Sequence, residues 1–112
     1  MQTTILDYST AGGKNLIEEY IDRLPQKEKL EAYKIRTSIR KEGLNALEGL
    51  NTRQLKGKLW EIKFSQNRIM YVIKDNENIY FLNICKKQKG KTEKFELDKA
   101  IKRAKESGLK VE

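Results

Sequence analysis

The chain has 112 residues, 38% of them hydrophobic, and this length suits one domain with a single modest core. Its 24 Lys and Arg residues outnumber its 16 Asp and Glu residues, which leaves a formal net charge of +8. A polyanion is therefore the expected partner, whether RNA, DNA or an acidic protein surface. We expect residues 1–112 to form one domain.

The single cysteine and the absence of histidine exclude several kinds of site. Cys85 cannot form an internal disulfide, and a chain without histidine cannot build a Ser/His/Asp triad or a Cys/His dyad, nor a zinc cluster from one thiol. We expect neither a metal nor another cofactor. The N-terminal region has no apolar run that resembles a signal peptide or membrane span, so we expect a cytoplasmic protein without a membrane partner.

The start of the chain predicts a short strand and a helix. The stretch TTILDYS, residues 3–9, is β-prone and is followed by two adjacent glycines, which favours an edge strand. Apolar residues then recur at spacings of one, three and four, which predicts an amphipathic helix from Asn15 that ends before Pro25. Its apolar residues are Leu16, Ile17, Tyr20, Ile21 and Leu24.

A second helix should begin at Pro25, because the N–H that proline lacks has no helical partner in a first turn. It should run to about Glu42, with Gly43 as its stop signal, and form a hairpin with the first helix. The next stretch, LNALEGLNTRQLKGK at residues 44–58, predicts a packed connection without regular structure. The expected inward-facing residues of the second helix are Ala32, Tyr33, Ile35 and Ile39.

Three β-prone runs follow, separated by two turn-like connections. LWEIKF alternates between apolar and polar residues, RIMYVIK and NIYFLNICK are rich in β-formers, and SQN and DNEN separate the runs. These runs predict three antiparallel strands. A lysine-rich stretch then precedes a last predicted helix from about Thr92 to Glu106, closed by Gly108, with Leu97, Ala100, Ile101 and Ala104 as its apolar stripe.

Period-two alternation assigns each side chain of these strands to one face of the sheet, once the turns fix the pairing. We expect the first turn to pair Lys63 with Arg68 and the second to pair Lys74 with Ile79. One face should then be core that the helices cover: Trp60, Ile62, Ile69, Tyr71, Ile73, Tyr80, Leu82 and Ile84. The opposite face should place cations beside a few apolar groups: Glu61, Lys63, Arg68, Met70, Val72, Phe81, Asn83, Cys85 and Lys87.

The order of these motifs resembles a known family. LKGKLWEIKF, NRIMYVIK and IYFLNICKKQKGKTEKFELDKAIKRAK are together similar to the C-terminal half of the RelE/HigB toxin superfamily, in particular its phage-derived HigB-like branch, best over residues 55–104. The resemblance implies a RelE-like α+β fold, in which a helical hairpin and a C-terminal helix pack a small antiparallel sheet of three main strands plus a possible N-terminal edge strand. It also implies the toxin of a type II toxin–antitoxin pair, an endoribonuclease that cleaves mRNA on the ribosome and is neutralised by a cognate antitoxin, expected to be a helix-turn-helix protein.

The resemblance also implies which residues contact RNA. Lys63 matches the basic residue that faces RNA from the first long strand, and Arg68 matches the arginine that contacts the scissile phosphate. Lys86 and Lys87 match the basic pair after the last strand. The chain departs from the family in two places: Cys85 stands where phenylalanine is usual, and the C-terminal Tyr or His of several members is not evident.

Metal-independent RNA cleavage by internal attack needs the 2′-hydroxyl deprotonated, the phosphate charge stabilised and the leaving 5′-oxygen protonated. Arginine offers phosphate oxygens a planar, permanently charged fork, which makes Arg68 the candidate stabiliser. A lysine can act as a base when neighbouring cations lower its pKa, and Lys63 would lie near Arg68 and Lys87. Glu61 is the alternative base, or it holds one of the cations in place.

Further lysines predict contacts with RNA phosphates that read no sequence and weaken with salt. They are Lys56, Lys58, Lys89, Lys91 and Lys94. Taken alone, a lysine run is most often a solvated loop, Trp60 is more often core than a base-stacking platform, and an isolated cysteine is most often inert.

Three functions stay open at this point. The first is an active endoribonuclease toxin whose partners are mRNA, ribosomal RNA and an antitoxin. The second is a RelE-like module of phage origin that has lost catalysis and binds nucleic acid or protein, which the missing Tyr or His keeps open. The third is an unrelated basic domain that docks on an acidic protein.

Overall fold

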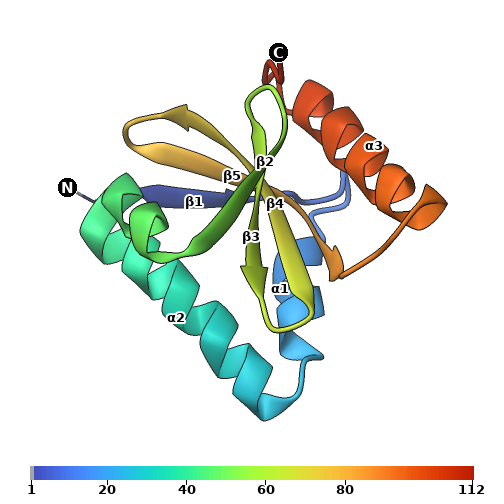
Figure 1. The fold of residues 1–112 in the computed structure, drawn as a ribbon. Helices are drawn as coiled ribbons and strands as arrows, with labels where there is room; N and C mark the ends of the chain where they lie inside the picture. The colour runs from blue at the N-terminus through green and yellow to red at the C-terminus, as the bar shows by residue number, and fades with distance from the viewer. Residues whose placement is uncertain (1) are drawn as a thin grey trace.

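A computed structural model, which describes residues 2–112, has a five-stranded mixed sheet with helices on both faces (Figure 1). The strand order is β1-β5-β4-β3-β2, in which β1 runs parallel to β5 and every other neighbouring pair is antiparallel. The predicted α+β class is confirmed. Among residues 2–112, no helix is both long and apolar enough to span a membrane. In chain order the elements are β1 (Thr4–Asp7), α1 (Leu16–Asp22), α2 (Gln26–Glu42), the 3-10 helix η1 (Gly43–Gly49), β2 (Asn51–Lys56), β3 (Leu59–Phe64), β4 (Asn67–Asp75), β5 (Asn78–Lys86) and α3 (Lys91–Glu106).

The two helices of the predicted hairpin begin one residue after their expected starts, Asn15 and Pro25. Asn15 precedes α1, and its side-chain oxygen accepts a 2.9 Å hydrogen bond from a backbone N–H of the first turn. Pro25 precedes α2, and Gly43, with a φ of 78°, follows it. The expected inward position of Tyr33 is wrong, because its side chain is 41% exposed and donates a 2.8 Å hydrogen bond to Asp22.

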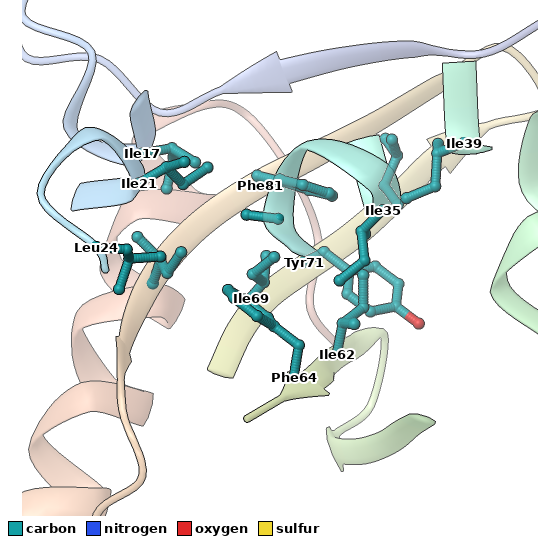
Figure 2. Close-up of a cluster of buried hydrophobic side chains, with 13 residues drawn as sticks. Ile17, Ile21, Leu24, Ile35, Ile39, Ile62, Phe64, Ile69, Tyr71 and Phe81 are labelled. Carbon is teal, nitrogen blue, oxygen red and sulfur yellow. The ribbon is translucent and has the colours of Figure 1, made fainter. Parts of the chain in front are cut away.

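The larger of two cores lies between the sheet and the α1–α2 hairpin, on what we call the hairpin face (Figure 2). Isoleucines of both helices meet branched and aromatic side chains of β3, β4 and β5, so the helical and strand periodicities converge on one apolar layer. Its buried members are Ile17, Ile21, Leu24, Ala32, Ile35, Ile39, Ile62, Phe64, Ile69, Tyr71, Ile79, Phe81 and Ile84.

A buried ion pair ties β1 to α2 beside this core. The two Nη groups of Arg36 donate to the carboxylate oxygens of Asp7 at 2.9 and 2.6 Å, and both side chains are almost fully covered. Asn15 donates to the same carboxylate at 3.0 Å. A buried charge needs such partners, and here they come from segments far apart in the chain, so the sequence alone did not predict the pair.

The opposite face, which we call the α3 face, carries a smaller core. Ala100 and Ala104 of α3 are fully buried against the sheet, and the C-terminal segment closes this core beside the β2–β3 turn, where the Lys58 N–H donates to the carbonyl of Val111. The cations Lys63 and Arg68 lie in one cross-strand row with Cys85 on this face, which agrees with the predicted mixture of cations and apolar groups. The buried members of the core are Leu59, Met70, Val72, Leu82, Cys85, Ala100, Ala104 and Val111.

The prediction of an irregular connection at residues 44–58 is wrong. This segment contains η1 and the edge strand β2, which pairs with β3. Only Thr52 and Leu55 of β2 are half-buried, and Leu55 is the residue through which this edge strand packs against the α3-face core. A short and mostly polar strand lacks the alternation that predicts strands, whereas the predicted N-terminal edge strand is confirmed as β1.

The predicted register is correct for β3–β4 but only in part for β4–β5. Lys63 pairs with Arg68 as expected, whereas Ile73, and not Lys74, lies opposite Ile79. Two irregularities in the β4–β5 ladder shift the register. Each one-residue shift changes which face the following side chains occupy.

These bulges move three aromatic or apolar side chains to the face opposite to the one expected. Phe81 lies in the hairpin-face core, while Tyr80 and Leu82 pack on the α3 face. Trp60 and Ile73 keep the predicted parity, since their cross-strand partners face the hairpin, but they are 36% and 40% exposed and so are not core.

Candidate active site

A cleft of about 130 Å³ opens on the α3 face of the sheet. Its walls come from β2, β3, β4, the end of β5, the loop after β5 and the start of α3. Five cations and three carboxylates line it, so it is a polar site at the margin of an apolar core. The lining residues are Arg53, Glu61, Lys63, Arg68, Met70, Cys85, Lys86, Lys87, Gln88, Glu93 and Glu96.

Two cross-strand rows, fixed by the sheet register, form the floor of the cleft. In one row Lys63 lies opposite Arg68, which in turn lies opposite Cys85. In the other row Arg53 lies opposite Glu61. Because directly opposite residues of antiparallel strands project from the same face, about 5 Å apart, the register alone brings these charged groups together.

Every residue predicted from the sequence to take part in catalysis lines the cleft. Lys87 enters from the loop after β5, where its backbone N–H donates a 2.7 Å hydrogen bond to the carbonyl of Gln66. Lys86 is turned partly away, because its Nζ lies 3.5 Å from Oε1 of Glu28, a residue of α2. The gathered residues are Glu61, Lys63, Arg68, Lys86 and Lys87.

Arg68 is anchored by the turn that precedes it. Its Nη1 donates to the backbone carbonyls of Asn67 at 2.8 Å and Ser65 at 3.4 Å. The rest of the guanidinium fork has no protein acceptor within residues 2–112. In the same part of the chain, neither Lys63 nor Lys87 forms an ion pair or a side-chain hydrogen bond. Lys63, Arg68 and Lys87 are therefore three neighbouring cations that an anion in the cleft could contact.

Three charged residues that line the cleft, Arg53, Glu93 and Glu96, were not predicted as site residues from the sequence. Arg53 Nε lies 2.9 Å from Oε2 of Glu61, a side chain only 3% exposed, and Arg53 Nη2 lies 3.9 Å from Oε1 of Glu93. Arg53 belongs to the strand that the sequence did not predict. Had β2 been recognised as a strand paired with β3, the position of Arg53 opposite Glu61 would have placed its side chain on the cleft face. The third residue, Glu96, projects from α3.

Buried carboxylates surround the only thiol. Glu96 is almost fully buried, and its Oε1 accepts a 2.8 Å hydrogen bond from Lys99 Nζ. Burial, aided by the charges of Glu96 and Glu61, raises the pKa of Cys85 to about 12. The thiol therefore stays protonated near neutral pH and is a poor nucleophile, which agrees with its expected inertness.

No tyrosine lines the cleft within residues 2–112. Burial raises the pKa of both Tyr20 and Tyr71 to about 12, and both pack against the hairpin-face core. The Tyr20 hydroxyl donates a 2.7 Å hydrogen bond to Asn67. Phe95 in α3 is 61% exposed but carries no proton to transfer.

The lysines expected to bind RNA fall into two separate groups. Lys89, Lys91 and Lys94 surround the start of α3, next to the cleft, although Lys94 Nζ also contacts Asp98 at 3.2 Å. Lys56 and Lys58 lie at the β2–β3 turn beside the C-terminus, at the other end of α3 (Figure 1). None of the lysines in either group lines the cleft.

Comparison with known proteins places the chain in a family. The family described as phage-derived Gp49-like protein (DUF891) matches residues 19–105, a range that contains every residue lining the cleft. No match was found among curated proteins. Because the match spans most of the chain, the protein belongs to the phage-derived Gp49-like family, a family of the RelE/HigB-like toxin kind.

Proposed function

We propose that this protein is the toxin of a type II toxin–antitoxin pair, from the HigB-like branch, and that its residues 1–112 act as one RelE-like domain that cleaves mRNA on the ribosome. The observation that carries the proposal is the meeting of Lys63, Arg68 and Lys87 at one cleft. Three cations without carboxylate partners of their own form a site for a phosphate, and the net charge of +8 favours an RNA substrate.

The proposed reaction is attack of a ribose 2′-oxygen on the adjacent phosphorus. The bond from phosphorus to the 5′-oxygen breaks, which leaves a 2′,3′-cyclic phosphate on one fragment and a 5′-hydroxyl on the other. Arg68 would donate to the equatorial phosphate oxygens, where negative charge grows in the transition state. Its anchor on the backbone of Asn67 supports this role, because a fixed donor needs little reorganisation during the reaction.

Two proton transfers complete the proposed reaction. Lys63, directly opposite Arg68 on the cleft floor, would take the proton of the 2′-hydroxyl in those molecules in which its amine is neutral, and the Lys87 ammonium would supply one to the leaving 5′-oxygen. Glu61 is better suited to hold Arg53 than to act as the base, because it is buried and paired at 2.9 Å. Lys86, drawn toward Glu28, would contribute charge alone.

The partners proposed for the toxin follow from its charge. The lysines around the start of α3, Lys89, Lys91 and Lys94, would bind phosphates of mRNA, while Lys56 and Lys58 would bind ribosomal RNA from the other end of the domain. A cognate antitoxin, proposed to be a helix-turn-helix protein, would neutralise the toxin.

A second function, a catalytically inactive binding module of phage origin, rests on one observation. Neither tyrosine nor histidine lines the cleft in the described residues, so proton transfer would depend on lysines and carboxylates. Such a module would bind RNA or protein with the same cations but leave RNA intact.

Purified protein and ribosome-bound mRNA, incubated with a metal chelator, separate these functions. The toxin should generate fragments with 2′,3′-cyclic phosphate and 5′-hydroxyl ends, and its induced expression should arrest growth unless a neighbouring antitoxin gene is expressed too. Fragments with 3′-hydroxyl and 5′-phosphate ends would contradict the proposed attack. Intact mRNA together with harmless expression would favour the binding module.

A further inference from the structure

We propose that Arg53 binds a second phosphate of the RNA chain, next to the scissile one, in an anion subsite that the Glu93 carboxylate contacts in the free protein. This inference rests on the proposed function and adds a phosphate ligand to it. Arg53 projects from the edge strand β2 into the same cleft as Arg68, and its side chain is 48% exposed. A flexible single strand can therefore reach its outer side.

Glu61 fixes the position of the Arg53 guanidinium. The Arg53 Nε lies 2.9 Å from Glu61 Oε2 as an ion pair, and this buried oxygen has no aligned hydrogen-bond donor within residues 2–112. A buried carboxylate needs a cation beside it, so Glu61 keeps Arg53 at the cleft when no RNA is bound. Because this contact uses Nε, the two Nη groups of the fork remain for a second anion.

Glu93 indicates where that second anion would lie. Its Oε1 is 3.9 Å from Arg53 Nη2, beyond hydrogen-bond distance, and both side chains are about half exposed. An exposed ion pair at this distance contributes little free energy, so an RNA phosphate that forms charge-assisted hydrogen bonds with the fork can displace it. The Arg53–Glu93 pair also links β2 to the first turn of α3 across the cleft. Displacement of Glu93 from Arg53 would therefore make room for the RNA chain between these two elements.

The test measures binding of an RNA oligonucleotide whose 2′-hydroxyls are methylated, so that it cannot be cleaved. Fluorescence anisotropy gives Kd at several salt concentrations. Arg53→Gln should weaken binding about five- to tenfold and lower the slope of log Kd against log salt by about 0.7, the value for one lost phosphate contact on a single strand. Arg23→Gln is the matched control, since Arg23 also pairs with a glutamate, at 3.1 Å, but lies outside the cleft.

The competition by Glu93 supplies the sharper comparison. Glu93→Gln should tighten binding about threefold in the wild-type background and have no effect in the Arg53→Gln background, because neighbouring groups that share a ligand are not additive. If Arg53→Gln proves unfolded by circular dichroism, Arg53→Lys replaces it. That variant keeps a charge beside Glu61 but loses the fork, and should bind about threefold more weakly.

Two results would overturn the inference. The first is that Arg53→Gln, or Arg53→Lys where it replaces that variant, binds RNA as tightly as Arg23→Gln does. The second is that Glu93→Gln tightens RNA binding equally in the wild-type and Arg53-variant backgrounds. Failure of the proposed function is seen separately. A wild-type protein that leaves mRNA intact, yet binds the methylated oligonucleotide in an Arg53-dependent way, would retain the phosphate subsite and lose the nuclease.

Discussion

The two faces of the sheet differ in what their side chains do. The hairpin face is covered by α1 and α2 and holds a continuous apolar core, with the Arg36–Asp7 ion pair fully satisfied beside it. The α3 face holds a smaller core and, next to it, a cleft with eight charged side chains. The difference indicates that the hairpin face stabilises the fold, and it supports the proposal that the α3 face carries the chemistry.

The charged groups of the two faces differ in how fully they are paired. On the hairpin face, Asp7 accepts both Nη groups of Arg36 and a further hydrogen bond from Asn15, so its charge is fully occupied. On the α3 face, Lys63 and Lys87 have no partner within residues 2–112, and the Arg68 fork is held at one end only. Charges left without partners at a cleft are available for a ligand.

Truncation of a large side chain in the hairpin-face core should have the largest effect on stability. Phe81 is completely buried there, so Phe81→Ala should lower the free energy of unfolding by about 3–5 kcal/mol, as measured by urea denaturation. Cleavage per folded molecule should stay at the wild-type rate. A loss below about 1 kcal/mol would mean that this core is not the main source of stability.

A smaller loss is expected where the C-terminal segment closes the α3 face. Gly57 has a φ of 53°, and a Cβ there would overlap the carbonyl of Val111. Gly57→Ala should therefore cost about 1–3 kcal/mol and expose the C-terminal residues to proteolysis. Gly13→Ala is the control, because its φ is also positive, at 87°, but no atom lies within 4 Å of the added Cβ. Equal losses in the two variants would contradict the packing of the C-terminus.

The two faces should also respond differently to alkali, with a still smaller effect. The pKa of Cys85 is raised from 9.0 to about 12, so above about pH 9 the unfolded chain loses the thiol proton while the folded chain retains it. The free energy of unfolding should then fall as pH rises. The pKa values of Tyr20 and Tyr71 are raised from 10.0 to about 12, so the hairpin face adds to the fall only above about pH 10.

Urea denaturation between pH 8 and about 11 separates these contributions. Cys85→Ala should remove the decline between about pH 9 and 10 and leave the decline at higher pH. The same early decline in Cys85→Ala and in the wild type would show that burial of the thiol is not its cause.

The sequence predicted which charged residues lie together better than it predicted the register of the sheet. The short turn after β3 fixed the pairing of Lys63 with Arg68, so period-two alternation placed both on one face correctly. The bulges in the β4–β5 ladder then moved Phe81 and Leu82 to the opposite faces. Bulges depend on packing between distant segments, which alternation along one strand does not reveal.

The parts of the site that escaped prediction depend on contacts distant in sequence. Arg53 lies on an edge strand that packs few apolar residues and has no clear pattern. Glu93 and Glu96 were read only as part of a helix, and their approach to the cleft depends on how α3 docks on the sheet. Local propensity predicts elements, whereas docking decides which of their charges meet.

The most direct test of the α3-face cleft as the catalytic site is the single-turnover rate of ribosome-bound mRNA cleavage by Arg68→Ala, compared with Arg23→Ala and the wild type. We predict that Arg68→Ala cleaves about 100- to 1,000-fold more slowly, because it loses an anchored donor to the transition state. Its free energy of unfolding should stay within about 1 kcal/mol of wild type, since the side chain is only partly buried. An Arg68→Ala protein that is folded and cleaves mRNA at the wild-type rate would contradict the assignment of the α3-face cleft as the catalytic site.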